Sequence, residues 1–386
     1  MTVASLFTAN GGDGRRIVMA KVQGAEGTID SLTPGTDEKL YDLGTMLKPI
    51  RESLSPNIVS PSYPGSRAYT TTEHVEVTVK SRLFGTAIVS ADSTDLWHPH
   101  ELLIASGWEL TSDATDKTHT YVLTANQGGV LSMQQYMLNA NNTATRNIHA
   151  GDIRGNCVIS ARYGKEWMFD FTGLGRNNDP STIRTYDANP WSTVGANFPS
   201  GLPFMLRGSS IYVYDQAGAV LYAGGSLSSP GTAGGLLGFT LNPGRKIILR
   251  GTGSATSGID GALAELENAT IDLTLEVNSN DLHLWQSQSK ALQFRIRSPQ
   301  PGASGNTATL LCYGYITDVA DDTIDEGRYL ASVKIKLAWP ADPSDNSPAA
   351  GQNPLSPWKT ATNQGVPLMP TSTLPVGIAV IQFATA

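Results

Sequence analysis

The sequence has few charged residues. Lys, Arg, Asp and Glu together make up 16% of its 386 residues, and no run of Lys or Arg stands out. Specific binding to a nucleic acid backbone relies on clustered positive charge, so we do not expect that class of function. The net charge of −7 decides little by itself. Apolar residues, at 40%, are sufficient for a packed core and exclude a disordered chain.

Cysteine is scarce as well. The two cysteines lie 155 positions apart, which is too few for a metal cluster or a disulfide scaffold. We expect two buried free thiols and a reducing compartment. No apolar run approaches the roughly 18 residues of a membrane span, and the first residues lack the apolar core of a signal peptide. The sequence therefore predicts a soluble protein without a classical secretion signal.

Motifs for phosphate binding and catalysis are missing. The stretch from Gly251 to Gly253 lacks the spacing and the Lys-Ser/Thr pair of a nucleotide-binding loop. No Ser/His/Asp or Cys/His combination can be assembled without arbitrary choices. We therefore predict that the protein is not an enzyme and that it has no cofactor.

Two groups of residues raise the question of a metal. His98, His100 and Glu101 lie at a helix start, but positions i and i+2 do not share one helical face, and a capping and surface role is favoured. An acidic hairpin turn lacks the loop pattern of an EF-hand, so a solvated turn is favoured over calcium binding; its residues are Asp321, Asp322, Asp325 and Glu326. We predict no metal site.

Glycine and proline, at 39 and 22 residues, are spread throughout, as is typical of many short strands and turns. From His74 to Leu83, valines at 75, 77 and 79 alternate with polar residues, which predicts a half-buried strand. A short helix is expected from His100 to Gly107, with Pro near its first turn and Gly at its end. Further strands are expected at 17–22, 118–123, 130–138, 157–163, 167–171, 211–213, 220–222, 246–250, 269–277, 292–297, 309–317 and 330–337.

Several segments occur twice in the same order. Cys157 and Cys312 each begin a strand-like run that leads through a polar turn into a second strand. Upstream, Asp95 to Trp97 matches His283 to Trp285, and the strand-like HVEVTV at 74–79 matches IDLTLEV at 271–277. The pattern predicts a duplicated β unit, which suits a symmetric assembly better than an enzyme.

The duplication suggests a division of the chain. We predict an N-terminal arm at 1–70, a first domain at 71–175, a connection at 176–205, a second domain at 206–340 and a C-terminal extension at 341–386. The arm contains a Pro/Ser-rich stretch from Lys48 to Ser66 that is poor at packing on itself. The apolar run from Val376 to Phe383 should pair with a sheet edge, in its own chain or a neighbour.

The order of segments resembles the tail tube proteins of long-tailed (siphovirus-like) bacteriophages. A strand ends in Leu83-Phe84-Gly85, HELLIASG follows at 100–107, and then come two strands and GNCVISARYGKEWMFDFTG, which ends in the aromatic-x-aromatic pattern of Phe169 to Gly173. Val22 to Thr28 resembles the family's opening strand and turn. The resemblance covers residues 15–175 well and 205–340 more loosely.

The resemblance implies a mainly β fold with two tandem β-sandwich or half-barrel domains, each with a short flanking helix. Inner sheets of neighbouring subunits would close a ring barrel, and stacked rings would form a hollow virion tube that delivers DNA. Three two-lobed chains or six chains would make a ring. The implied partners are other copies of the chain, the tape measure, tail terminator and baseplate proteins, and DNA in transient passage. Assembly would follow synthesis in the host cytoplasm.

The lumen of such a tube should be neutral to acidic, so that phosphates do not adhere. The candidate lumen-facing residues are Glu76, Thr78, Asp272, Thr274 and Glu276. Each could instead merely face solvent. Two other classes stay open: another virion β protein, such as a capsid decoration or receptor-binding protein, and a carbohydrate-active β-sandwich enzyme, which would need paired carboxylates that the sequence does not locate.

Overall fold

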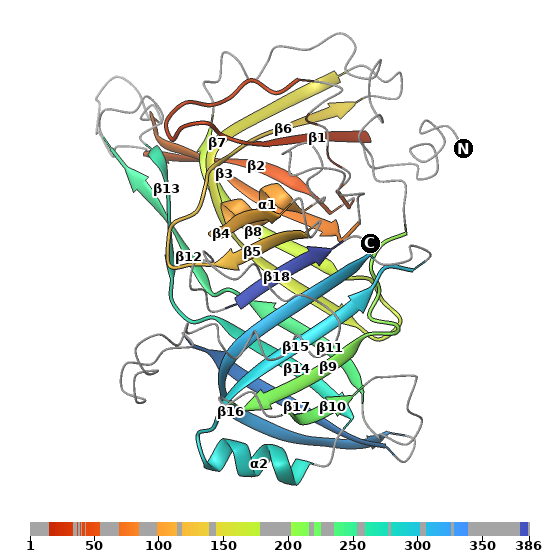
Figure 1. Ribbon diagram of the computed structural model, residues 1–386. Coiled ribbons are helices and arrows are strands. Elements are labelled where there is room, and N and C mark those ends of the chain that lie inside the picture. The colour runs from red at the N-terminus through yellow and green to blue at the C-terminus, as the bar shows by residue number, and fades with distance from the viewer. Residues whose placement is uncertain are drawn as a thin grey trace, which may run out of the picture.

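The computed structural model is mainly β, with two short helices and large antiparallel sheets among the residues that it describes (Figure 1). It describes residues 15–33, 37, 39, 41–42, 44–54, 69–84, 99–113, 118–138, 144–177, 202–215, 220–224, 235–252, 259–276, 279–301, 306–325, 328–338 and 379–384. Asp95 to Trp97, His98 and Glu326, which the sequence interpretation used, lie outside these ranges.

The helices and strands are numbered in chain order. The first half of the chain contains β1 (Arg15–Val22), β2 (Met46–Leu54), β3 (Tyr69–Arg82), α1 (His100–Ala105), β4 (Trp108–Asp113), β5 (Thr118–Leu123), β6 (Leu131–Leu138), β7 (Ala144–Arg162) and β8 (Met168–Asn177). The second half contains β9 (Ser210–Asp215), β10 (Val220–Gly224), β11 (Leu236–Asn242), β12 (Arg245–Gly251), β13 (Ile259–Leu266), β14 (Thr270–Glu276), α2 (Ser279–Ser287), β15 (Ala291–Pro299), β16 (Thr307–Asp325), β17 (Arg328–Leu337) and β18 (Ala379–Ala384).

The strand order repeats. In the first half, neighbours run β1-β6-β7-β8-β3-β2, and in the second half they run β9-β15-β16-β17-β14-β11. All these pairs are antiparallel, and β7 and β16 are both 19 residues long. The helices follow equivalent strands, since α1 comes after β3 and α2 after β14. The match between 74–79 and 271–277 therefore identifies strands in equivalent places.

The two halves share one 16-stranded sheet. β11 of the second half pairs with β7 of the first, and β18 lies between β16 and β5. The C-terminal strand was expected to pair with one sheet edge, and it pairs with two. In Figure 1, β18 (dark blue) lies between the half that contains β7 and the half that contains β16. Among the described residues the main path of the sheet ends at β10 and β2, and no closed barrel is present.

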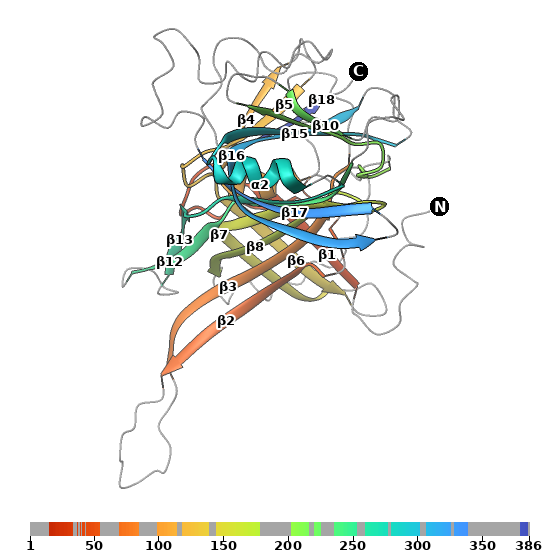
Figure 2. The same cartoon turned by 90° about the horizontal axis from the view of Figure 1, so that it is seen from below.

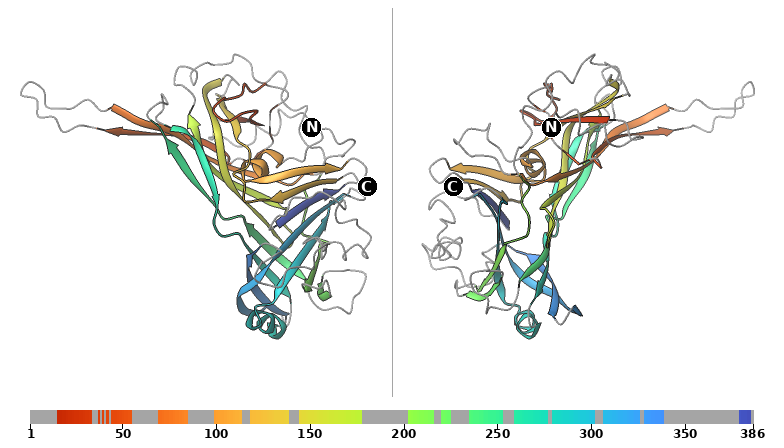
Figure 3. Two further views of the ribbon diagram at one scale, coloured as in Figure 1. Left: turned by 60° about the vertical axis from the view of Figure 1, so that its left-hand side comes forward. Right: turned by 90° about the vertical axis from the view of Figure 1, so that its right-hand side faces the viewer.

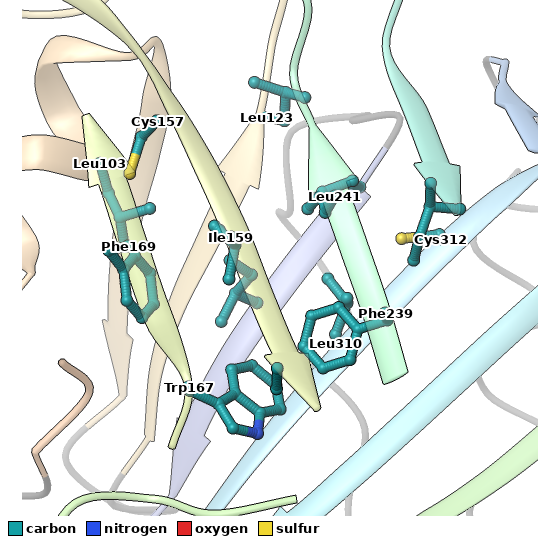
Figure 4. Close-up of a cluster of buried hydrophobic side chains, with 14 of the residues drawn as sticks. Leu103, Leu123, Cys157, Ile159, Trp167, Phe169, Phe239, Leu241, Leu310 and Cys312 are labelled. Atoms are coloured by element: carbon teal, nitrogen blue, oxygen red, sulfur yellow. The ribbon is translucent and has the colours of Figure 1, made fainter. Parts of the chain in front are cut away.

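The core fills the space enclosed by the folded sheet. Trp167, just before β8, contacts Phe239 of β11 edge to face at 4.8 Å between ring centroids. Its indole N–H donates to Ser298 Oγ of β15 at 3.1 Å, so the buried polar atom of a large aromatic residue is satisfied. Figure 4 shows these rings beside Ile159, Leu241 and Leu310, which come from both halves of the chain. One continuous core thus holds both halves together.

The cysteines are buried and free, as expected, but they do not mark equivalent positions. Cys157 lies opposite Phe171 in the β7–β8 ladder, whereas Cys312 lies opposite Phe294 in the β15–β16 ladder. The equivalent of the β7–β8 ladder is the β16–β17 ladder, so the match of the two cysteine segments was wrong in register. The two cysteines drew attention as a matching pair because the chain has no others, but a shared residue type does not show that two positions are equivalent.

Four strands, β2, β4, β11 and β13, were missed, and the start of β7 was placed too late. The stretch from Lys48 onward was predicted to be poor at packing, yet β2 pairs with β3 from Met46↔Thr78 to Leu54↔Tyr69. β7 begins at Ala144, well before the predicted strand at 157, because its polar first half pairs with β6. The predicted helix is confirmed as α1, which Gly107 follows at a φ of +79°. No described helix has the length and apolar character of a membrane span.

Candidate functional site

The predicted lumen residues lie on one face of the sheet. On β3, Val75, Val77 and Val79 are buried, Glu76 is exposed and Thr78 is half-buried. On β14, Ile271, Leu273 and Leu275 are buried, Asp272 is exposed, and Thr274 and Glu276 are half-buried. All six apolar side chains belong to one core cluster. The five polar residues therefore lie on the side away from that core, which we call the open face.

The open face spans the boundary between the halves. β3 and β14 are separated by β8, β7 and β11 in the order β3-β8-β7-β11-β14. Four strand spacings of about 4.8 Å place the two sets of residues roughly 19 Å apart along the sheet. The structure thus brings Glu76 and Thr78 onto the same surface as Asp272, Thr274 and Glu276 without bringing the two sets into contact.

Charges of both signs alternate on this face. Lys48 Nζ lies 3.3 Å from Glu76 Oε2, and Lys80 Nζ lies 3.8 Å from Asp170 Oδ1. Asp272 lies opposite Lys334 of β17 in the ladder. These groups are exposed, so each ion pair contributes little to stability and mainly sets the local charge. The surface is a mixed one rather than a uniformly acidic one.

The hairpin of β12 and β13 covers part of the open face over β7 and β8. Arg154 of β7 donates from Nη1 to the carbonyl oxygen of Ala262 on β13, and its Nη2 lies 3.1 Å from Glu26 Oε2. The Arg154 side chain holds the pKa of Glu26 below its usual value through a hydrogen bond, with charge attraction from Arg250 adding to the effect. Arg250 of β12 in turn contacts Asp260 at 2.8 Å. Polar contacts hold the hairpin to the first half of the chain.

Arg245 anchors the same hairpin on the core side. Its Nη2 donates to the carbonyl oxygens of Gly107 and Thr124, at the end of α1 and after β5. Its backbone N–H donates to Asn156 Oδ1 of β7 at 3.1 Å. Burial lowers the pKa of Arg245 to about 10. An arginine from the second half thus closes the end of a helix in the first.

The junction between the half-sheets is short and regular. β11 pairs with β7 antiparallel from Gly238↔Arg162 to Leu241↔Ile159, and Tyr163 N donates to Leu237 O at 2.7 Å. Residues 159 and 160 also pair with β8, so β11 and β8 lie on opposite edges of β7. The first half of β7 uses the β11 edge for β6. One edge of β7 therefore carries β6 and then β11.

Two strand edges that correspond to those joined in the β11–β7 junction, one on β2 and one on β16, are unpaired among the described strands. β2, the equivalent of β11, pairs with β3 alone. β16, the equivalent of β7, pairs with β15 only up to Tyr315, while its opposite edge pairs with β17 to Asp325. One edge of β2 and one edge of the last part of β16 are thus unpaired among the described strands, and Figure 2 shows β2 and β3 extending well away from the other strands.

Two residues on the outer edge of β2 have no backbone N–H available to a further strand. Leu47 N donates to Gln135 Oε1 of β6 at 2.7 Å, so this N–H points away from β3. Residues two apart in a strand point their N–H groups to the same side, and Pro49, two residues on, has none. Pro49 therefore costs the β2–β3 ladder nothing and removes a donor from the outer edge, as is common on edge strands.

The groups considered for metal binding have other partners. His100 Nδ1 lies 3.0 Å from the hydroxyl of Tyr121, and Glu101 pairs with Lys39. Within the described ranges, no three His, Cys, Asp or Glu side chains are grouped closely enough to hold a metal ion. The acidic segment 321–325 forms the end of β16 rather than a turn.

No protein-family model and no curated protein matches the chain. The functional features that sequence reasoning missed are the edges of β2 and β16 and the hairpin of β12 and β13. A signal for the first existed in the sequence, because β2 carries alternating Leu47, Pro49 and charged residues, but its proline suggested a loop.

Proposed function

We propose that the protein is a structural virion subunit that polymerises as stacked rings into the hollow tail tube of a long-tailed bacteriophage. The observation that carries this proposal is the repeated strand order, whose two copies join edge to edge through β11 and β7. A chain that already joins two equivalent units in one sheet, and leaves the equivalent edges open at its ends, is suited to continue the same contact with further copies.

The duplication favours three chains per ring. Each chain would supply two equivalent units, so three chains would give a pseudo-sixfold ring. Closing the ring would remove the open sheet edges that otherwise promote aggregation. A ring of six chains, with the second half outside the tube wall, is the alternative.

The open face is the surface that would line the channel. Its mixture of carboxylates, hydroxyls and paired lysines would not hold phosphate groups tightly, so DNA could pass. Glu76, Thr78, Asp272, Thr274 and Glu276 would contribute to this lining. The hairpin of β12 and β13 covers one part of the face and would narrow the exposed strip.

Electron microscopy of the purified protein tests the proposal. We expect stacked rings or tubes with a central channel, and we expect averaged end views to show three chains in six similar lobes. Monomers at every concentration and salt condition would contradict the proposal. Six identical two-lobed chains per ring would retain the tube and overturn the trimer.

A further inference from the structure

We propose that the hairpin of β12 and β13 is a flap over the open face, hinged at Arg245 and held closed by a charged latch at Glu26. Opening the flap would uncover the strip of β7 and β8 over which the hairpin lies. The inference concerns a single chain, so it holds or fails independently of the proposed function.

The hairpin is attached weakly along its length. Its two strands pair only with each other, whereas every other described strand belongs to the main sheet. Its buried apolar side chains, Ile259, Ala262 and Ala264, belong to none of the core clusters found among the described residues. Segments with few buried apolar contacts are those that open locally at low free-energy cost. The hairpin can therefore separate from the sheet without disturbing the core.

The base of the hairpin is fixed. Arg245 donates to the carbonyl oxygens of Gly107 and Thr124, which belong to the first half of the chain. Leu266, opposite Arg245 in the β12–β13 ladder, packs against the main core cluster. Gly244, just before Arg245, has a φ of +67°, a backbone conformation that glycine adopts readily. Movement of the hairpin must therefore pivot at this end.

The other end is held by Glu26, which lies in the turn after β1. Its Oε2 lies 3.1 Å from Nη2 of Arg154 on β7, and its Oε1 lies 3.5 Å from Nη2 of Arg250 on β12. Arg154 also donates to the carbonyl oxygen of Ala262 on β13. One carboxylate thus links an arginine of the sheet to an arginine of the hairpin.

The surroundings of Glu26 favour this contact. Gly261 lies opposite Arg250 in the ladder, and a Cβ at 261 would lie only 3.4 Å from Glu26 Oε1, so glycine leaves room for the turn beside the hairpin. The turn itself is held by Asp152 of β7, whose Oδ1 accepts from the N–H of Gly27 at 2.7 Å. Asp152 is fully buried and has a φ of +52°, a conformation that persists in a non-glycine residue where the surroundings fix it. The turn should therefore keep Glu26 in place when the hairpin lifts.

The latch depends on charge, so salt should weaken it. Arg250 and Glu26 are 44% and 35% exposed, and exposed charges are screened over a few ångströms at about 1 M salt. The contact between Arg154 and Glu26 is better shielded, because Arg154 is only 6% exposed. Removing the charge of Glu26 should release both contacts at once.

Thiol labelling of an Ala262→Cys variant tests the flap in dilute solution. Ala262 is 1% exposed, so a thiol there can react only when the hairpin lifts. The buried native cysteines serve as an internal reference for global unfolding, and the introduced thiol should react at least roughly tenfold faster than they do. Adding Glu26→Gln should raise its labelling rate roughly tenfold further, because hydrogen bonds to a charged group are lost.

Glu267→Gln is the matched control. It removes the same charge and an ion pair with Lys246, but it does so at the base of the same hairpin, where both side chains are exposed. Labelling of the Ala262→Cys variant should change by less than about twofold. Equal effects of Glu26→Gln and Glu267→Gln would overturn the latch.

Ala264→Cys provides a second reporter, since Ala264 is 2% exposed and lies on the same side of β13 as Ala262. It should be labelled at a similar rate, because the hairpin moves as one unit, and it decides the question if Ala262→Cys prevents folding. Raising NaCl to about 1 M should speed labelling of either reporter, and should do so less when Glu26→Gln is present. Introduced thiols that react no faster than the native cysteines would overturn the flap.

Discussion

The guanidinium group of Arg245 donates from Nη2 to the carbonyl oxygen of Gly107, which joins the hairpin of β12 and β13 to the end of α1. Gly107 has a φ of +79°, and a Cβ at this position would overlap the Arg245 guanidinium. Figure 3 shows the hairpin, between β11 and β14 in the chain, running alongside strands of the first half. The two residues fix how the second half of the chain meets the first.

Arg245→Ala should destabilise the protein by about 2–3 kcal/mol, because it removes two hydrogen bonds from a charged donor to buried carbonyls. Gly107→Ala should cost about 1–2 kcal/mol for the positive φ alone, and more for displacing the arginine. The double variant should cost less than the sum, since alanine at 245 removes the overlap. Urea unfolding of all four proteins measures this coupling, and strictly additive losses would show that the two side chains act independently.

Phe383→Ala in β18 should cost about 3–5 kcal/mol, because Phe383 is fully buried and packs edge to face on Tyr121 of β5. Leu284→Ala on α2 is the control, since Leu284 is 50% exposed and its truncation should change stability by less than about 0.5 kcal/mol. Thermal unfolding compares them. A Phe383 variant as stable as the Leu284 variant would mean that β18 does not close the gap between β5 and β16.

The two thiols should be unreactive in the folded protein. Burial raises the pKa of both Cys157 and Cys312 far above the usual value, so the reactive thiolate is suppressed. A thiol reagent at pH 8 should modify neither residue in native buffer and both in denaturant. Rapid native labelling of either would contradict their place in the core.

Stability should decrease as pH falls below about 6.5. Burial lowers the pKa of His100 and of His149 relative to their usual value of 6.5, although Glu101 and a backbone contact at Asp30 oppose this. A histidine with a lowered folded-state pKa binds fewer protons when folded, so its stabilising effect is complete above the unfolded pKa and is lost as pH drops toward the folded pKa. The Tm at pH 5.5 should be lower than at pH 7.5, and His100→Gln should reduce that difference.

The control for the pH experiment is His283→Gln, because His283 lies on the exposed side of α2. It should leave the pH dependence as in the unmodified protein. A Tm difference that is the same in the His100 and His283 variants would assign the effect to other groups.

The open face gives a prediction about DNA passage. Asp272→Lys combined with Glu276→Lys should allow assembly and slow genome delivery, because added cations would hold phosphates. Asp272 is exposed, whereas Glu276 is half-buried near Tyr222, whose pKa burial and Glu276 together raise to about 12. Infectivity of reconstituted particles measures the effect. Normal delivery would count against a channel-lining role for these residues.

Sequence reasoning found the strands whose apolar residues alternate regularly, such as β3 and β14, because burial of one sheet face imposes that period. It missed β2, since Pro49 is tolerated there only because the strand is at an edge, and edges depend on the whole topology. The cysteine match failed for a related reason. Identity of residue type carried no information about which neighbouring strand each thiol faces.

The lumen candidates could be assigned to one face from alternation alone, and the structure places all five there. The junction of β11 with β7 could not be predicted, because the β7 residues with which β11 pairs lie more than 70 positions earlier in the chain. Long-range pairing of this kind is decided by the fit of entire half-sheets rather than by local propensity.

The central claim is that this chain forms hollow rings from two equivalent units per subunit. Image reconstruction of the purified, assembled protein tests it most directly. The account predicts stacked rings of three chains, in which the open face lines the channel. A particle that stays monomeric in every condition, or a ring whose channel is lined by another surface, would contradict it.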